Sequence, residues 1–179
     1  MEYRRLWHAG GTYFFTVNLL QRRNNDLLVR HIDVLRASIA KVKTRHPFII
    51  HAWVVLPDHF HCVIELPEGD VDFATQLRLI KVGFSKALPK TEFRSDVRNA
   101  RGERGIWQCR FWEHLIKSDK DYQAHVDYVH INPLKHGLVK QVADWPHSTF
   151  HKSVETGVYA ADWAGNTEIE VAGGESFGG

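Results

Sequence analysis

Seven segments of the chain carry a clear hydrophobic pattern, and their order restricts the fold more than any other feature of the sequence. Strand-like and helix-like segments follow one another as strand, helix, strand, strand, helix, strand, helix. These predicted elements span residues 12–20, 31–45, 48–56, 59–66, 73–88, 111–116 and 118–132. The first six make the split βαββαβ order of a ferredoxin-like fold. We therefore predict an α+β fold with an antiparallel sheet and an extra C-terminal helix.

The composition excludes several classes of protein. With 179 residues, 44% hydrophobic and 25% charged, the chain is long enough for one domain with a core, and it is not collagen, coiled coil or bulk disorder. No apolar run approaches the roughly 18–20 residues of a membrane span. The start has no apolar signal-peptide region. Cys62 and Cys109 cannot form a disulfide framework or a common zinc pattern. We expect a reducing, cytoplasmic setting.

Charge is unevenly distributed, although the net charge is only +2. Residues 78–110 hold nine basic and three acidic side chains, whereas residues 153–179 hold five acidic side chains and neither Lys nor Arg. The basic region suggests a polyanionic partner, and the alternative is a solvated loop. Within it we predict a flexible basic loop over residues 89–105. We divide the chain into a domain over residues 1–152 and an acidic, Gly-rich tail over residues 153–179. The tail either competes with the polyanion for the basic region or is simply solvated.

Two histidines stand at the start of the third predicted strand, in the sequence His59-Phe60-His61. Side chains alternate across a strand, so His59 and His61 face one side and Phe60 faces the other. Two imidazoles held in this way can share one divalent metal ion, while Phe60 packs into the core. The alternative is a pair of surface histidines at a hairpin turn.

The last predicted helix carries two tyrosines on different faces. Tyr122 lies on an apolar stripe with Val126 and Val129, which is typical of a core residue. Tyr128 lies about 200° round from Val126, on a second, polar face that also carries Asn132. A helix laid across the sheet would bring Tyr128 and Asn132 over the two histidines. The alternative for Tyr128 is an ordinary half-exposed tyrosine that forms hydrogen bonds at the surface.

A histidine pair followed by a helical tyrosine resembles the HUH single-strand transposases, and more closely the REP-associated tyrosine transposases of bacteria. The resemblance covers most of the chain, to roughly residue 165. It is carried by residues 2–5 (EYRR), 10–18 (GGTYFFTVN), 53–62 (WVVLPDHFHC), 108–116 (QCRFWEHLI), 121–139 (DYQAHVDYVHINPLKHGLV) and 144–151 (DWPHSTFH).

The resemblance implies roles for four residues. His59 and His61 match the metal ligands, for Mg²⁺ or Mn²⁺, and Asn132 occupies the place of a third polar ligand. Tyr128 matches the nucleophile that cleaves and rejoins hairpin-forming repeat DNA through a 5′-phosphotyrosine. The implied partner is single-stranded or hairpin DNA, bound by a monomer, with a dimer as the alternative.

DNA binding also needs basic side chains for the phosphates. Our candidate contacts are Arg78, Lys81, Arg110 and Lys135, each of which alone could be a solvated surface charge. Two other functions remain open at this stage. One is a non-catalytic protein that binds hairpin single-stranded DNA and keeps a vestigial nuclease site. The other is an unrelated metal phosphoesterase, which would release free products.

Overall fold

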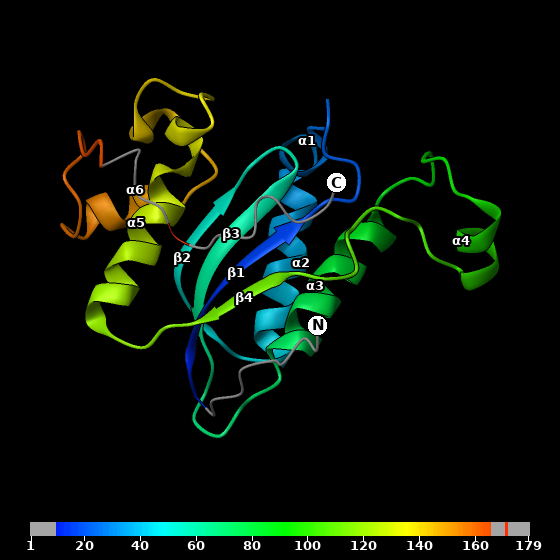
Figure 1. Cartoon of the computed structure of the whole chain (residues 1–179), viewed down its shortest axis with the longest axis horizontal. Coiled ribbons are helices and arrows are strands. Elements are labelled where there is room, and N and C mark those ends of the chain that lie inside the picture. Colours follow the sequence, from blue (N-terminus) through cyan, green and yellow to red (C-terminus); the bar gives the residue numbers. More distant parts are fainter. Residues whose placement is uncertain (1–9, 166–170, 172–179) are drawn as a thin grey trace.

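The computed structural model describes residues 10–165 and residue 171, which build a four-stranded antiparallel sheet (Figure 1). The strands lie in the order β2-β3-β1-β4, and all three pairings between neighbours are antiparallel. This is the strand order of the predicted split βαββαβ fold, which is therefore confirmed. The strands are β1 (Thr12–Asn18), β2 (Ile49–Val55), β3 (His59–Glu65) and β4 (Trp112–Leu115).

Helices cover both faces of the sheet (Figure 1). Because side chains alternate along β1, neighbouring Phe14 and Phe15 belong to two different buried clusters. Phe15 lies in the cluster under the helices of the first face, and Phe14 lies in the cluster under the single long helix of the second. The first face carries α2 (Ile32–Arg45) and α3 (Phe73–Ala87), with the short α1 (Leu27–Arg30) before α2; the second carries α5 (Asp119–Lys135). No helix in the described ranges is long and apolar enough to cross a membrane.

The prediction of a flexible loop over residues 89–105 was wrong, because this segment contains the helix α4 (Asp96–Arg101). Ser95 caps its start by accepting a hydrogen bond from Arg98 N, and Gly102 ends it with a φ of 67°. Arg104 holds the base of the segment by donating to main-chain carbonyls and pairing with Glu92. The helix has no buried residue, so it leaves no apolar pattern in the sequence. It projects away from the sheet (Figure 1).

The C-terminal region packs further along the chain than we predicted. The boundary between residues 152 and 153 falls inside α6 (Phe150–Glu155), which follows the short 3₁₀ helix η1 (Val142–Asp144). Tyr159 is buried and Trp163 packs beside it, with 4.9 Å between the ring centroids. The packed unit therefore reaches at least Trp163. Beyond residue 165, the predicted acidic tail lies outside the described residues except for residue 171, and its competition with a polyanion stays a prediction.

Removing residues 155–179 should destabilise the protein. The shortened chain loses Tyr159 and Trp163 from the cluster around Phe150, so we expect the free energy of unfolding to fall by about 3 kcal/mol. Urea unfolding followed by circular dichroism measures this change. A chain that ends at Gly165 keeps both aromatic residues and is the matched control. Equal stability of the two shortened chains would contradict the packing.

Candidate active site

The strand β3 presents its two histidines on the face that α5 covers. His59 and His61 are both buried, and their ring centroids lie 4.8 Å apart at an interplanar angle of 85°. Phe60 faces the opposite side, where its ring centroid lies 5.0 Å from that of Trp53. The alternation predicted from the sequence is therefore confirmed, and the alternative of a surface pair is wrong.

Each histidine is held by a hydrogen bond at Nδ1. His59 Nδ1 donates to Asp58 Oδ1 at 2.7 Å, and Asp58 Oδ2 accepts from Arg22 Nε at 2.7 Å. His61 Nδ1 is hydrogen-bonded to Thr16 Oγ1 at 2.7 Å, across the β1–β3 register. A carboxylate partner at Nδ1 fixes the ring tautomer and leaves the lone pair of Nε2 available, as in many metal-binding histidines.

Electrostatic interactions favour an ionised Asp58 beside a neutral His59. Burial by itself would raise the pKa of Asp58, but the hydrogen bonds and charges of His59 and Arg22 outweigh it and lower that pKa to about 2. Burial lowers the pKa of His59 and outweighs the opposing effect of Asp58. An ionised carboxylate beside a neutral imidazole is the arrangement that a metal ligand requires.

The helix α5 brings Tyr128 against the histidine pair. The Tyr128 ring centroid lies 5.3 Å from that of His61 and 5.8 Å from that of Phe14, and Lys135 Nζ lies 4.7 Å from the same ring centroid. Tyr128 is only 2% exposed, so the predicted polar face is in fact buried against the sheet and the half-exposed alternative is wrong. The other tyrosine, Tyr122, is half-buried and bonds to His51 Nδ1 at 3.0 Å, away from the pair.

Along the chain, Asn132 lies midway between two residues that contact the histidines, Tyr128 within α5 and His136 just after it. The Tyr128 ring contacts His61, and the ring centroid of His136 lies 5.3 Å from that of His59. Asn132 is fully buried and donates from Nδ2 to Tyr128 O at 2.8 Å. The helix runs through Pro133 to Lys135, so the proline does not break it at this point.

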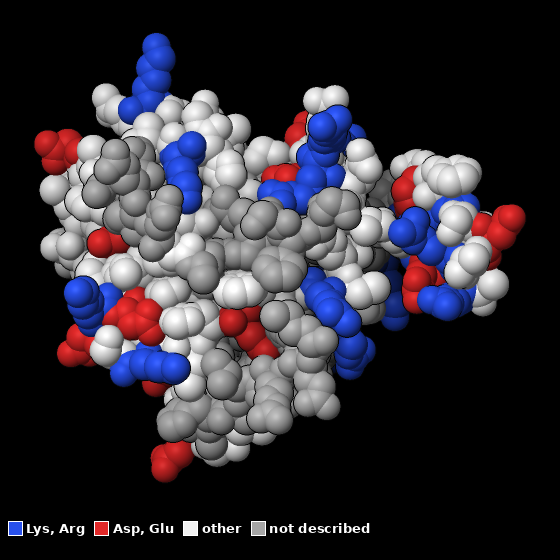
Figure 2. All heavy atoms as spheres, viewed as in Figure 1, with Lys and Arg blue, Asp and Glu red and all other residues white. Residues whose placement is uncertain are grey.

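The four predicted DNA contacts do not gather around the tyrosine. Lys135 lies over the Tyr128 ring, whereas Arg78 and Lys81 lie on α3, at the opposite face of the sheet. Burial lowers the pKa of Lys81, whose Nζ donates to Gln108 O at 2.8 Å. Arg110 is exposed just before β4. On the face seen in Figure 2, Lys and Arg form several separate groups, and the α4 segment carries both signs of charge.

A cavity of about 470 Å³ forms the mouth of the site. Some of the residues that line it were not among our predicted site residues. Asp58 and His59 line it together with Arg22 and His136. Asp58 directly precedes the histidine pair, which is a signal that the sequence offered. Arg22 is separated from Asp58 by 36 positions in the chain and carries no such signal.

A second polar cluster joins β4 to the start of α5. Asp121 lies 2.9 Å from His114 Nε2 and 3.0 Å from His125 Nδ1, and the two imidazoles stack with 4.4 Å between their centroids. In the described part of the chain, these three residues form a group whose possible ligand atoms all lie within 4.8 Å of one another, close enough to share a metal ion. Its ligand atoms already bond to one another, so it acts as a hydrogen-bonded clamp between the two elements.

Two similar proteins and one solved structure decide the family. A REP-associated tyrosine transposase of Escherichia coli (strain K12) is 52% identical over 172 residues, which cover 96% of each chain. A Haemophilus influenzae protein assigned to the same family is 42% identical over 174 residues, covering 96% of this chain and 98% of its own. A solved REP-associated tyrosine transposase bound to a REP hairpin superposes with a TM-score of 0.83 at 51% identity, over 97% of this chain and 96% of that one.

The chain belongs to the REP-associated tyrosine transposases. The resemblance read from the sequence is thereby confirmed, although no family model matches the chain. In this transposase Tyr128 of α5 packs against His61 of β3, and Asn132 is buried one turn further along the same helix.

Because its carboxylate holds His59 Nδ1, Asp58 should orient the ring for the divalent cation that the sequence analysis predicts. In an Asp58→Asn variant the ring loses its anionic partner, so we expect Mn²⁺ affinity to fall by roughly 10–100-fold. Isothermal titration with Mn²⁺ measures the change. Asp162→Asn, at an exposed position, is the control and should bind as the natural chain does. Unchanged affinity in Asp58→Asn would show that this carboxylate does not orient the ring.

Proposed function

We propose that this transposase is a metal-dependent single-strand DNA endonuclease that cleaves and rejoins hairpin-forming repeat DNA. The observation that carries the proposal is the contact between Tyr128 and the histidine pair, with 5.3 Å between the rings of Tyr128 and His61. The sequence and structural relatives support a REP-like substrate, since the solved relative is bound to a REP hairpin.

The residues around the pair fit a divalent cation. Among the described residues, neither His59 Nε2 nor Asn132 Oδ1 has a hydrogen-bond partner, although both atoms are buried. Buried polar atoms normally have a partner, and a divalent cation is a partner that both an imidazole nitrogen and an amide oxygen can bind. His59, His61 and Asn132 would hold Mg²⁺ or Mn²⁺. When bound, such an ion supplies positive charge for a phosphate oxygen in the transition state.

Tyr128 would act as the nucleophile. Its phenol gives up its proton to solvent as the oxygen attacks the phosphorus of the scissile bond, a tyrosine–phosphate bond forms, and the bond to the 3′ oxygen breaks. The departing oxygen takes up a proton and becomes a free 3′-hydroxyl. Phe14 and His61 pack against the tyrosine ring and restrict its position, while Lys135 places a positive charge beside it.

The same residue would also rejoin DNA. The phosphotyrosine retains the energy of the broken phosphodiester, so a 3′-hydroxyl from another strand reverses the step without ATP. One tyrosine therefore serves cleavage and joining in turn.

A covalent adduct tests the proposal. We expect the protein incubated with Mn²⁺ and a labelled REP-type hairpin to produce a labelled protein band on a denaturing gel. Binding in a native gel without that band would favour a non-catalytic DNA-binding protein. Cleaved free products without the band would favour a metal phosphoesterase.

A further inference from the structure

The polar cluster between β4 and α5 lies at the edge of the sheet and contains neither histidine of the pair. His114 belongs to β4, the last strand in the sheet order, and Asp121 and His125 stand one turn apart near the start of α5. The side chains of His114 and Asp121 are 30% and 22% exposed, whereas that of His125 is only 6% exposed. A small ion can therefore reach the cluster from solvent.

The polar atoms of this cluster are spaced for a metal ion. His114 Nε2 lies 2.9 Å from Asp121 Oδ2, and His125 Nδ1 lies 3.0 Å from Asp121 Oδ1. One possible ligand atom from each of the three residues lies within 4.8 Å of the other two. Two ligands of a tetrahedral Zn²⁺, each about 2.1 Å from the ion, are about 3.4 Å apart. Small rotations of the side chains would bring the three atoms to that spacing.

A bound ion would replace protons that join these groups in the clamp. The carboxylate accepts a hydrogen bond from His114 Nε2, and His125 Nδ1 donates to Asp121 O at 2.8 Å. In a neutral imidazole the ring proton can sit on either nitrogen, so a change of tautomer turns the facing nitrogen into a ligand. Lys117 N donates to Asp121 Oδ2 at 2.9 Å and would continue to hold the carboxylate.

The charge states of the cluster suit metal binding. Burial by itself would raise the pKa of Asp121, but the hydrogen bonds from Lys117 N and His114 and the charges of both histidines outweigh it and lower that pKa. Burial lowers the pKa of His125 and outweighs the opposing effect of Asp121. An ionised carboxylate and a neutral imidazole are the forms that coordinate a metal ion.

The kind of ligand favours Zn²⁺ over the harder cations. Imidazole and carboxylate groups are typical ligands of Zn²⁺ and of similar transition-metal ions, whereas Mg²⁺ and Ca²⁺ prefer sites built from oxygen atoms. Three protein ligands leave the fourth tetrahedral position to water. The partial exposure of His114 and Asp121 gives that water access.

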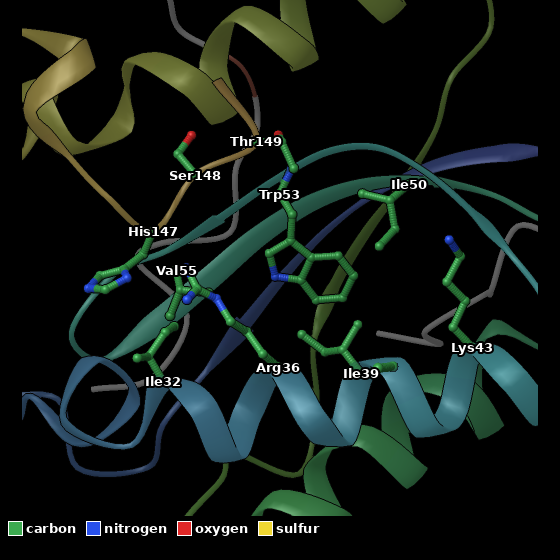
Figure 3. Close-up of a pocket in the computed structure, with 11 residues that line it drawn as sticks. Ile32, Arg36, Ile39, Lys43, Ile50, Trp53, Val55, His147, Ser148 and Thr149 are labelled. Atoms are coloured by element: carbon green, nitrogen blue, oxygen red, sulfur yellow. The ribbon is translucent and has the colours of Figure 1, made fainter. Parts of the chain in front are cut away.

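His147 offers a comparison, because it is an imidazole in an apolar setting. It lines a groove of about 330 Å³ between α2 and β2 (Figure 3). Burial and the charge of Arg36 lower its pKa, so this imidazole is also neutral. In the described part of the chain, none of the residues that line this groove is Asp, Glu or Cys. The groove therefore lacks the carboxylate and the second imidazole that the cluster provides.

We propose that His114, Asp121 and His125 bind Zn²⁺ or a similar transition-metal ion, which links β4 to α5. The ion would hold the start of the helix that carries Tyr128. The His125 ring centroid lies 4.9 Å from that of Phe14, which in turn lies 5.8 Å from that of Tyr128. The site uses neither His59 nor His61, so the inference does not rest on the proposed function.

Zn²⁺ binding by the His59→Ala/His61→Ala chain tests the proposal, because this background lacks the histidine pair. After treatment with EDTA and removal of the chelator, titration calorimetry should show one saturable Zn²⁺ site per chain. Asp121→Asn and His125→Ala should each raise the Kd by more than about 100-fold, since loss of a ligand costs more than loss of a residue that only positions one. His147→Ala is the matched control and should leave the Kd unchanged.

Thermal unfolding followed by circular dichroism provides a second measurement. Saturating Zn²⁺ should raise the Tm of the background chain by about 5 °C and leave that of Asp121→Asn unchanged. His114→Gln, at the exposed end of the cluster, carries the same expectation and replaces Asp121→Asn if that variant does not fold. No saturable Zn²⁺ site in the background chain, or equal affinity in the ligand variants, would overturn the proposal. The experiment contains no DNA, so a failure of the cleavage proposal would leave its result unchanged.

Discussion

A Tyr128→Phe variant should lose covalent adduct formation by at least about 10³-fold, while its Kd for hairpin DNA stays within about twofold. The substitution removes one oxygen, which is the proposed nucleophile, and keeps the ring that packs against Phe14 and His61. Quantified denaturing gels give the adduct, and fluorescence anisotropy gives the Kd.

Tyr122→Phe is the matched control, because it removes the same oxygen from the same helix. Tyr122 bonds to His51 rather than to the histidine pair, so this variant should form the adduct normally. Loss of the adduct in Tyr122→Phe and its retention in Tyr128→Phe would show that the wrong helix face has been assigned to catalysis.

Under the proposed function, removal of either histidine should weaken both metal binding and cleavage. Loss of a residue that only positions a ligand, such as Asp58, costs roughly 10–100-fold in metal affinity. In His59→Ala or His61→Ala a ligand itself is lost, so we expect Mn²⁺ affinity to fall further. Cleavage should fall in parallel, and added Mn²⁺ should restore it only in part, because one of the ligands is missing. Titration calorimetry and cleavage gels measure the two effects.

His46→Ala is the control for the His59 and His61 variants, because it removes an exposed imidazole at the end of α2. That variant should bind Mn²⁺ and cleave DNA normally. Full activity of the double variant His59→Ala/His61→Ala in EDTA would remove the metal ion from the mechanism.

The order of elements and the histidine pair were predictable because both depend on local geometry. Residues at alternate positions of a strand share a face whatever the strand packs against, so His59 and His61 could be placed together and Phe60 opposite. The helical period likewise separated Tyr122 from Tyr128.

The environment of Tyr128 was less predictable. A helical period gives the angle between two side chains and says nothing about which side of the helix meets the sheet. The face of Tyr128 and Asn132 looks polar in the sequence, yet α5 packs this face against β2 and β3. Similarly, α4 buries no residue, and a helix without a buried face leaves no apolar period to find.

The sequence by itself determined the fold, the family and the spacing of the candidate site. The tertiary structure decided which other residues reach that site. Thr16 and His61 are 45 positions apart, and Arg22 and Asp58 are 36 apart, so no local pattern links them. Arg78 and Lys81 belong to the same basic region as Arg110, but α3 carries them on the opposite face from Tyr128. Local periodicity arises from the backbone of one element, whereas a site arises where separate elements pack together, and only the folded chain defines that packing.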